Sequence, residues 1–129
     1  MKTVTAKDAP PAIGPYSHAV IENGLVFTSG QIPLSPETGE IVEGGIKEQA
    51  EQCVKNLKAV LSAAGSDIAH VVKTTCFLTD MGDFSAFNEV YARHFTGKPA
   101  RSCIGVLALP KSAKVEIEAV AVMTNPAEH

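Results

Sequence analysis

The sequence predicts an α+β fold in which five or six strands form one sheet and two helices cover one of its faces. Two stripes of apolar residues at helical spacing predict the helices, and short runs rich in β-branched and aromatic residues predict the strands. At 129 residues and 13.5 kDa the chain has the usual size of one domain, so residues 1–129 are expected to fold as a single unit.

The chain is expected to begin with an arm and a β-hairpin. Residues 1–16 contain three prolines close together, which excludes a helix or a central strand and favours an ordered arm. Strands are predicted at His18–Glu22 and Leu25–Ser29, because Asn23-Gly24 between them suits the positive φ angles of a type I′ turn. Prolines and glycines between residues 33 and 45 then predict a loop.

A long amphipathic helix and a buried strand follow. From Ile46 to Ala64, apolar residues recur every three or four positions and charged residues take the other side. Gly65 is well placed to end this helix in the left-handed conformation. Residues Val71–Leu78 are dense in β-branched and aromatic side chains and predict a strand with few charges on either face.

The last third of the chain predicts a second helix and two more strands. Asp83 is expected to cap a helix whose apolar stripe runs from Phe84 to Phe95. Strands are predicted at Arg101–Leu109 and Val115–Val122. Two helices can cover only one face of such a sheet, and several strands are apolar on both sides. We therefore expect a homo-oligomer that buries the second face.

Charge and composition exclude several classes of function. The formal net charge is −3 and no block of like charge could follow a phosphate backbone, so nucleic acid is not expected as a partner. The longest apolar runs fall far short of the roughly 20 residues of a membrane span, and the first residues lead into no signal-peptide stretch. Three widely spaced cysteines, Cys53, Cys76 and Cys103, suggest free thiols in the cytosol.

Motifs for common cofactors are missing from the sequence. There is no phosphate-binding glycine loop, no dinucleotide-binding glycine pattern, no His-Glu-x-x-His and no Cys-x-x-Cys. The four histidines lie far apart, and none has a partner at metal-ligand spacing. The sequence therefore predicts neither a metal site nor a cofactor.

The main candidate for chemistry is the segment around Arg101. Strand alternation places Arg101 and Cys103 on one face, where a guanidinium could bind a carboxylate through two parallel hydrogen bonds. From position alone, an arginine at the start of a strand that points into solvent is the favoured interpretation. Cys103 has no His or Lys neighbour in sequence that would lower its pKa, so packing is favoured over covalent catalysis; Cys53 and Cys76 are expected in the core.

Other candidates have equally ordinary explanations. Glu116 and Glu118 share one face of the last strand, where a carboxylate could orient a water molecule or simply face solvent. Tyr16 follows a rigid Gly-Pro pair and could either contact a ligand or anchor the arm. Ser29-Gly30 ends a strand, where glycine permits a ligand to approach the backbone or forms a plain turn.

Six segments of the chain, in order between about Ala9 and Val122, resemble the RidA (YjgF) family of imine and enamine deaminases. These segments are Ala12-Ile13-Gly14-Pro15-Tyr16-Ser17, Thr28-Ser29-Gly30-Gln31-Ile32-Pro33, Lys73-Thr74-Thr75, Asn88-Glu89-Val90-Tyr91, Pro99-Ala100-Arg101-Ser102-Cys103 and Val115-Glu116-Ile117-Glu118. Six ordered blocks form a far stronger signal than any one of them.

The resemblance implies a chorismate-mutase-like α+β fold with a mixed sheet, assembled as a homotrimer with a site in each cleft between subunits. It implies that Arg101 binds the substrate carboxylate and that Glu116, rather than Glu118, handles the water. The implied pocket also contains Tyr16, Ser29, Gly30, Asn88 and Cys103, with Tyr16 contributed across the interface.

The implied substrates are 2-iminopropanoate and 2-iminobutanoate with their enamine tautomers, including 2-aminoacrylate, and the products are 2-keto acids and ammonia. Two alternatives remain open from the sequence. One is a regulatory or chaperone-like trimer that binds metabolites or proteins without catalysis. The other is RNA cleavage, which the acidic charge and the lack of a histidine pair disfavour.

Overall fold

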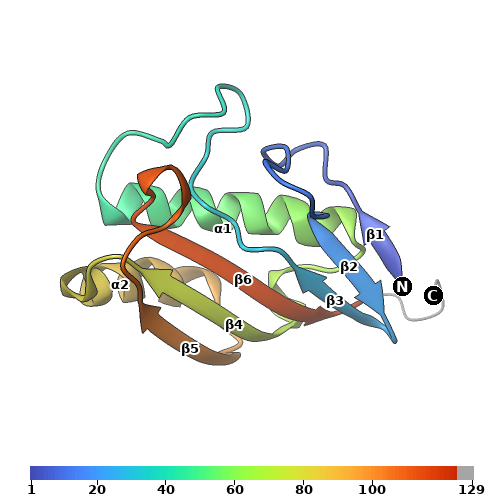
Figure 1. The fold of residues 1–129 in the computed structure, drawn as a ribbon. Coiled ribbons are helices and arrows are strands. Elements are labelled where there is room, and N and C mark those ends of the chain that lie inside the picture. The colour runs from blue at the N-terminus through green and yellow to red at the C-terminus, as the bar shows by residue number, and fades with distance from the viewer. Residues whose placement is uncertain (125–129) are drawn as a thin grey trace.

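Six strands and two α-helices make up the fold in a computed structural model that describes residues 1–124 (Figure 1). The predicted α+β class, the two helices and the six-stranded upper limit of the sheet are confirmed. The elements are β1 (Lys2–Val4), β2 (Ala19–Glu22), β3 (Leu25–Thr28), α1 (Ile46–Ala63), β4 (Val71–Leu78), α2 (Phe84–His94), β5 (Ala100–Gly105) and β6 (Val115–Val122).

The sheet is mixed, with strand order β1-β2-β3-β6-β4-β5. Neighbouring strands are antiparallel except β4 and β5, which are parallel. Parallel strands need a crossover connection, and α2 supplies it between β4 and β5. β6, the last strand in sequence, therefore lies inside the sheet between β3 and β4.

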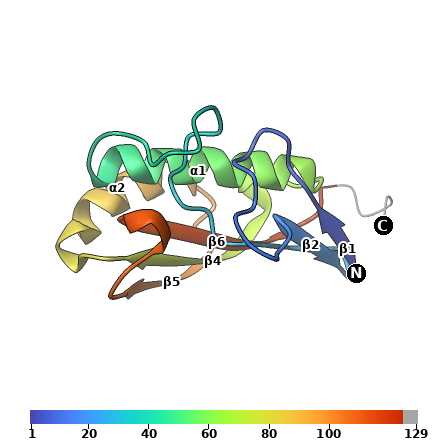
Figure 2. The same cartoon turned by 45° about the horizontal axis from the view of Figure 1, so that its top comes forward.

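Both helices lie on the same side of the sheet (Figure 2). The core fills the space between them and the sheet, where Leu57, Phe87 and Ile117 are completely buried. Cys53 and Cys76 belong to this core, as predicted, and all three cysteines are free thiols.

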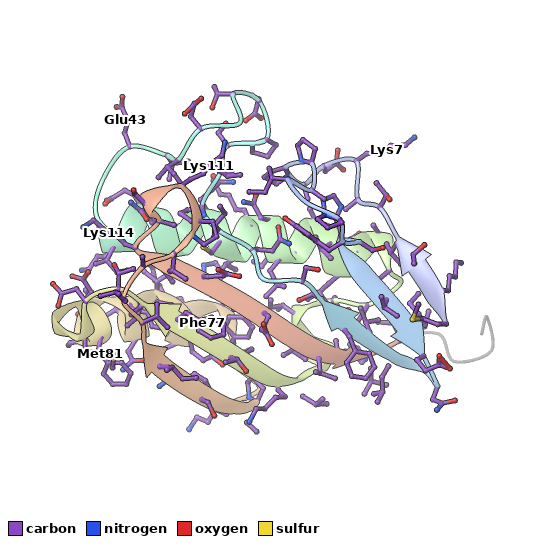
Figure 3. The ribbon with its side chains drawn as sticks, in the orientation of Figure 1. Lys7, Glu43, Phe77, Met81, Lys111 and Lys114 are labelled. Atoms are coloured by element: carbon purple, nitrogen blue, oxygen red, sulfur yellow. The ribbon has the colours of Figure 1, made fainter. Side chains whose placement is uncertain are left out.

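The other face of the sheet has no helix over it and carries exposed apolar side chains. Phe27 is 42% exposed, Ile104 is 45% exposed and Val122 is 38% exposed. Phe77 of β4 lies on this open face, paired in register with Glu116 on one side and Ile104 on the other (Figure 3). The predicted half-covered sheet is confirmed, and the oligomer that would cover it stays a prediction.

Local signals in the sequence explain several boundaries. Asn23 and Gly24 both have positive φ, at 52° and 76°, as a type I′ hairpin turn requires. Glu48 accepts a hydrogen bond of 2.8 Å from the Gly45 N–H, which satisfies a backbone donor at the start of α1. Gly65 follows the end of α1 with a φ of 81°, as predicted.

Three details differ from the prediction. The first residues of the arm form the edge strand β1, because they pair with β2 before the prolines begin. The strand predicted to run to Leu109 ends at Gly105, because its partner β4 ends at Leu78 and offers no backbone beyond it. Asp83 occupies the N-cap position of α2 without a capping hydrogen bond, since a short 3₁₀ turn precedes the helix.

None of the helices in the described residues has the length and apolar character that a bilayer span requires.

Candidate active site

Arg101 is held rigidly on the helix side of the sheet. Its Nη1 donates a hydrogen bond of 2.7 Å to Asn88 Oδ1 on α2. Its guanidinium carbon lies 4.7 Å from the centre of the Tyr91 ring and 5.5 Å from the centre of the Phe84 ring. These contacts fix the side chain, so the alternative that Arg101 points freely into solvent is wrong.

The aromatic support beneath Arg101 is itself anchored. The hydroxyls of Tyr91 and Thr74 are 2.7 Å apart in a buried hydrogen bond, and the Tyr91 ring stacks on Phe95 at 4.3 Å between ring centres. A cavity of about 520 Å³ opens beside Arg101; it is lined by Tyr91, Ala92, Phe95, Thr96, Lys98, Pro99 and Arg101. We call it the Arg101 cavity.

The guanidinium of Arg101 has no ion-pair partner among the described residues. Within residues 1–124 no carboxylate lies within ion-pair distance of Arg101, whereas Arg93 on the same side of the molecule pairs with Glu51 at 2.9 Å. Two of the guanidinium nitrogens can therefore meet a carboxylate in the bidentate geometry that arginine favours.

Cys103 lies on the same face of β5 as Arg101, as strand alternation predicts, and both side chains are half-buried. Burial raises the pKa of the Cys103 thiol, and the nearby charge of Arg101 opposes this only in part. A thiol that resists ionisation is a poor nucleophile, so the geometry agrees with a packing role.

Glu116 lies in a second cavity, on the open face of the sheet. This Glu116 cavity has a volume of about 320 Å³ and is lined by Ile13, Tyr16, Ser29, Gly30, Ile32, Pro110 and Glu116. Burial raises the pKa of the Glu116 carboxyl, and the charge of Glu118 raises it further. Glu118 itself is exposed. The structure therefore distinguishes the two carboxylates, which strand alternation alone places on the same face.

Gly30 allows the Glu116 carboxyl to lie against the backbone. A Cβ atom at position 30 would be 2.7 Å from Glu116 Cδ and 3.0 Å from Cγ, and closer still to Oε2. Any larger residue would therefore displace the carboxylate. Beside it, Ser29 Oγ donates to the Ser17 carbonyl at 2.6 Å, which joins the end of β3 to the end of the arm.

The candidate residues thus form two groups on opposite faces of the sheet. Tyr16, Ser29, Gly30 and Glu116 line one cavity, whereas Arg101, Asn88 and Cys103 lie together on the helix side. Strand β4 separates β5, which carries Arg101, from β6, which carries Glu116. One copy of the chain does not bring Arg101 and Glu116 to a single ligand.

Several residues at the two cavities were not predicted from the sequence. Ile13, Ile32 and Pro110 line the Glu116 cavity, and Phe84 and Tyr91 lie against Arg101. The sequence does carry a signal for Phe84 and Tyr91, because both belong to the apolar stripe of α2 that faces the sheet. Ile32 and Pro110 come from loops whose meeting depends on the tertiary fold.

No group of three or more His, Cys, Asp or Glu side chains in the part of the chain that the structure describes could hold a metal ion.

Comparison with known proteins identifies close relatives. The family described as Endoribonuclease L-PSP matches residues 6–123. A Mus musculus protein named 2-iminobutanoate/2-iminopropanoate deaminase is 49% identical over 122 residues, which cover 94% of this chain and 90% of the relative. A Lactococcus lactis protein named as a regulator, AldR, is 52% identical over 122 residues, 94% of this chain and 97% of the relative.

Solved structures agree with the fold. RidA from the Antarctic bacterium Psychrobacter sp. PAMC 21119 superimposes with a TM-score of 0.91 at 43% identity, covering 95% of this chain and 100% of that one. TdcF from E. coli with bound serine superimposes with a TM-score of 0.90 at 44% identity, covering 96% of this chain and 100% of that one.

Proposed function

This chain belongs to the Endoribonuclease L-PSP family, and we propose that within this family it is a deaminase that hydrolyses small reactive imino acids in the cytosol. The resemblance to RidA proteins is confirmed by the relatives and structures that carry that name or the deaminase name. The proposed substrates are 2-iminopropanoate and 2-iminobutanoate with their enamine tautomers, and the products are 2-keto acids and ammonia.

The observation that carries the proposal is the immobilised Arg101 guanidinium with no carboxylate partner in the described residues. A planar cation in a cavity with aromatic walls suits a small organic carboxylate better than it suits a neutral ligand. The serine bound to TdcF is a small carboxylate of this size, which supports the same ligand class here.

Hydrolysis needs little beyond orientation, because the carbon of a C=N bond is already electrophilic. With the substrate carboxylate on Arg101, Glu116 accepts a proton from a water molecule whose oxygen adds to the imine carbon, while the nitrogen takes up a proton. The resulting carbinolamine then expels ammonia and leaves the 2-keto acid. Burial raises the pKa of Glu116, which moves the carboxyl in the direction that favours a group that must both accept and return a proton.

We propose that each site is completed by two copies of the chain in a homotrimer. Arg101 and Glu116 lie on opposite faces of the sheet, so a ligand of three or four carbons cannot touch both within one chain. The open face with Phe27, Ile104 and Val122 exposed is the surface that a neighbouring copy would cover. Tyr16, which lines the Glu116 cavity, would then act across the interface from Arg101.

The activity is tested by adding the protein to threonine dehydratase and following 2-keto acid release. The wild-type protein should accelerate release, Arg101→Ala should abolish the effect, and Arg101→Lys should restore little of it because lysine lacks the planar fork. Arg93→Ala is the matched control: it removes an exposed arginine of α2 that pairs with Glu51. Equal activity of Arg101→Ala and wild type would refute the proposal.

Sharing of the site is tested by complementation. Arg101→Ala and Glu116→Ala chains carrying different tags are co-expressed, and mixed oligomers are purified through both tags. If each site takes Arg101 from one copy and Glu116 from the next, one of the three sites in every trimer that contains both chains regains both groups. Complete inactivity of the mixed oligomer would place both groups in one chain.

The name of AldR favours a second candidate, a regulatory protein that binds a small metabolite without turnover. In that case a short 2-keto acid should bind the wild-type protein and lose affinity in Arg101→Ala, while no imine is hydrolysed faster than in buffer. Measuring binding by calorimetry beside the coupled assay separates the two functions.

A further inference from the structure

His18 ties the arm, defined here as residues 5–17, to the start of β2. The side chain is only 5% exposed. The backbone N–H of Ala6 donates to Nδ1 at 2.8 Å, and Nε2 lies 2.8 Å from the carbonyl oxygen of Pro10. One buried ring therefore holds two points of the arm that are four residues apart.

These two partners fix the form of the imidazole. A backbone N–H can only donate, so Nδ1 must be the acceptor and carry no proton. A carbonyl oxygen can only accept, so Nε2 must carry the proton and donate it to Pro10. His18 thus fits the arm only as the neutral ring protonated on Nε2.

The arm has few other attachments. Ile13 N–H donates to the Tyr16 hydroxyl at 3.3 Å, and Tyr16 N–H donates to the Gly14 carbonyl at 2.9 Å, but both bonds lie within the arm. Among the residues that the structure describes, the hydrogen bonds that tie the arm to the rest of the chain are the two bonds of His18 and, at its last residue, the bond from Ser29 Oγ to the Ser17 carbonyl. Lys7, between the two tethered points, extends away from the molecule (Figure 3).

The same arm supplies one wall of the Glu116 cavity. Ile13 and Tyr16 line that cavity together with Ser29, Gly30 and Glu116. Both side chains are more than 45% exposed, so the cavity itself does not lock them in place. Their position depends on how the arm is anchored on either side. Ala6 and Ala9 are buried before them and His18 supplies the polar contacts there, while the Ser29 hydroxyl holds the Ser17 carbonyl after them.

We propose that His18 is a positioning residue of the site: it holds the arm so that Ile13 and Tyr16 close one side of the Glu116 cavity. His18 contacts no ligand itself and acts through the arm. The inference rests on the proposed function for its readout in activity, but the anchoring of the arm is measured without any substrate.

Two variants separate the two bonds. In His18→Asn the amide oxygen lies near the place of Nδ1 and can keep the Ala6 bond, whereas in His18→Gln the amide nitrogen lies near Nε2 and can keep the Pro10 bond. His18→Leu loses both. The readouts are hydrogen exchange of the Ala6 amide, trypsin cleavage after Lys7 and the kcat and KM of imine hydrolysis.

Loss of one buried hydrogen bond should raise the population of released arm about tenfold. The Ala6 amide is therefore expected to exchange about tenfold faster in His18→Gln and faster again in His18→Leu, and to stay protected in His18→Asn. Cleavage after Lys7 should accelerate in all three variants. In His18→Leu the value of kcat/KM should fall by more than in either amide variant, through a higher KM.

Ser66→Ala is the matched control, because Ser66 is 7% exposed and its hydroxyl donates to the Val122 carbonyl at 2.7 Å, away from the arm. It should lower the melting temperature without changing Lys7 cleavage or KM. An unchanged Ala6 exchange rate in His18→Leu would overturn the anchoring, and a released arm with full activity would overturn the positioning role. A wild-type protein that hydrolyses no imine would refute the proposed function instead, and Ala6 exchange would still decide what His18 holds.

Discussion

Replacing Gly30 by alanine should displace the Glu116 carboxylate and little else. The new Cβ would stand 2.7 Å from Glu116 Cδ, whereas ordinary contacts begin at 3.4 Å, so the carboxyl carbon must retreat by at least 0.7 Å (3.4 minus 2.7) and Oε2 by more. The backbone of Gly30 has no positive φ, so alanine fits its conformation. A misplacement of this size in a reacting group costs about 100-fold in rate.

The assay is kcat for imine hydrolysis, measured for Gly30→Ala and for Gly97→Ala. Gly97 is the matched control, because a Cβ there would meet nothing within 4 Å and its φ is not positive. We expect kcat to fall about 100-fold in Gly30→Ala and to change little in Gly97→Ala. Full activity of Gly30→Ala would refute the reasoning, since it would mean that the carboxylate need not lie where the structure places it.

Stability offers an independent check on the same contact. The clashing atoms belong to the end of a flexible side chain, so Gly30→Ala should cost only about 0.5–1.5 kcal/mol of unfolding free energy in the wild-type background, the cost of an off-rotamer Glu116. In a Glu116→Ala background the carboxyl is gone, so the cost of Gly30→Ala should largely vanish. An equal cost in both backgrounds would show that Gly30 is constrained by something other than Glu116.

Three further results are expected. Thr74→Val should lower the unfolding free energy in urea by about 1–3 kcal/mol, because it leaves the buried Tyr91 hydroxyl without its partner; an unchanged value would mean that water replaces the bond. Glu116→Gln should be more stable than the wild type in thermal melts at pH 7. Burial raises the folded-state pKa of Glu116, so its ionisation destabilises the native state at pH values above the ordinary pKa of 4.5. The stability advantage of the glutamine variant should disappear as the pH falls below 4.5. A gain that persists in acid would contradict this. Cys103 should react slowly with a thiol reagent at pH 7 and faster as the pH rises, because burial raises its pKa. Fast labelling at pH 7 that is lost in Cys103→Ser would contradict this.

The elements that the sequence predicts well are those with a local cause. The hairpin follows from Asn23-Gly24, whose positive φ angles need no distant partner, and α1 follows from its own apolar stripe. The sequence does not predict β1, because its three residues beside a proline-rich arm form a strand only through pairing with β2. The end of β5 was missed for the same reason, since it depends on where β4 stops.

The site shows the same division between local and distant causes. Alternation along β5 correctly predicts that Arg101 and Cys103 share a face, but it does not say which face meets the helices. In the same way alternation groups Glu116 with Glu118, and only the arrival of Gly30 and Pro110 from other segments buries one and leaves the other exposed. Contacts of this kind are set by the tertiary fold and leave no periodic trace in the sequence.

The placement of Arg101 and Glu116 on opposite faces also constrains how the protein could have acquired its chemistry. A guanidinium near a carboxylate within one chain would form an ion pair, which would use up both charges and lower the carboxyl pKa. With the sheet between them, Arg101 keeps a charge without a carboxylate partner in the described residues, and the pKa of Glu116 is raised rather than lowered. If two copies complete the site, the substrate's own carboxylate can pair with Arg101 while Glu116 remains free to move a proton. Separation across the sheet would thus preserve in each chain the two properties that the proposed reaction needs.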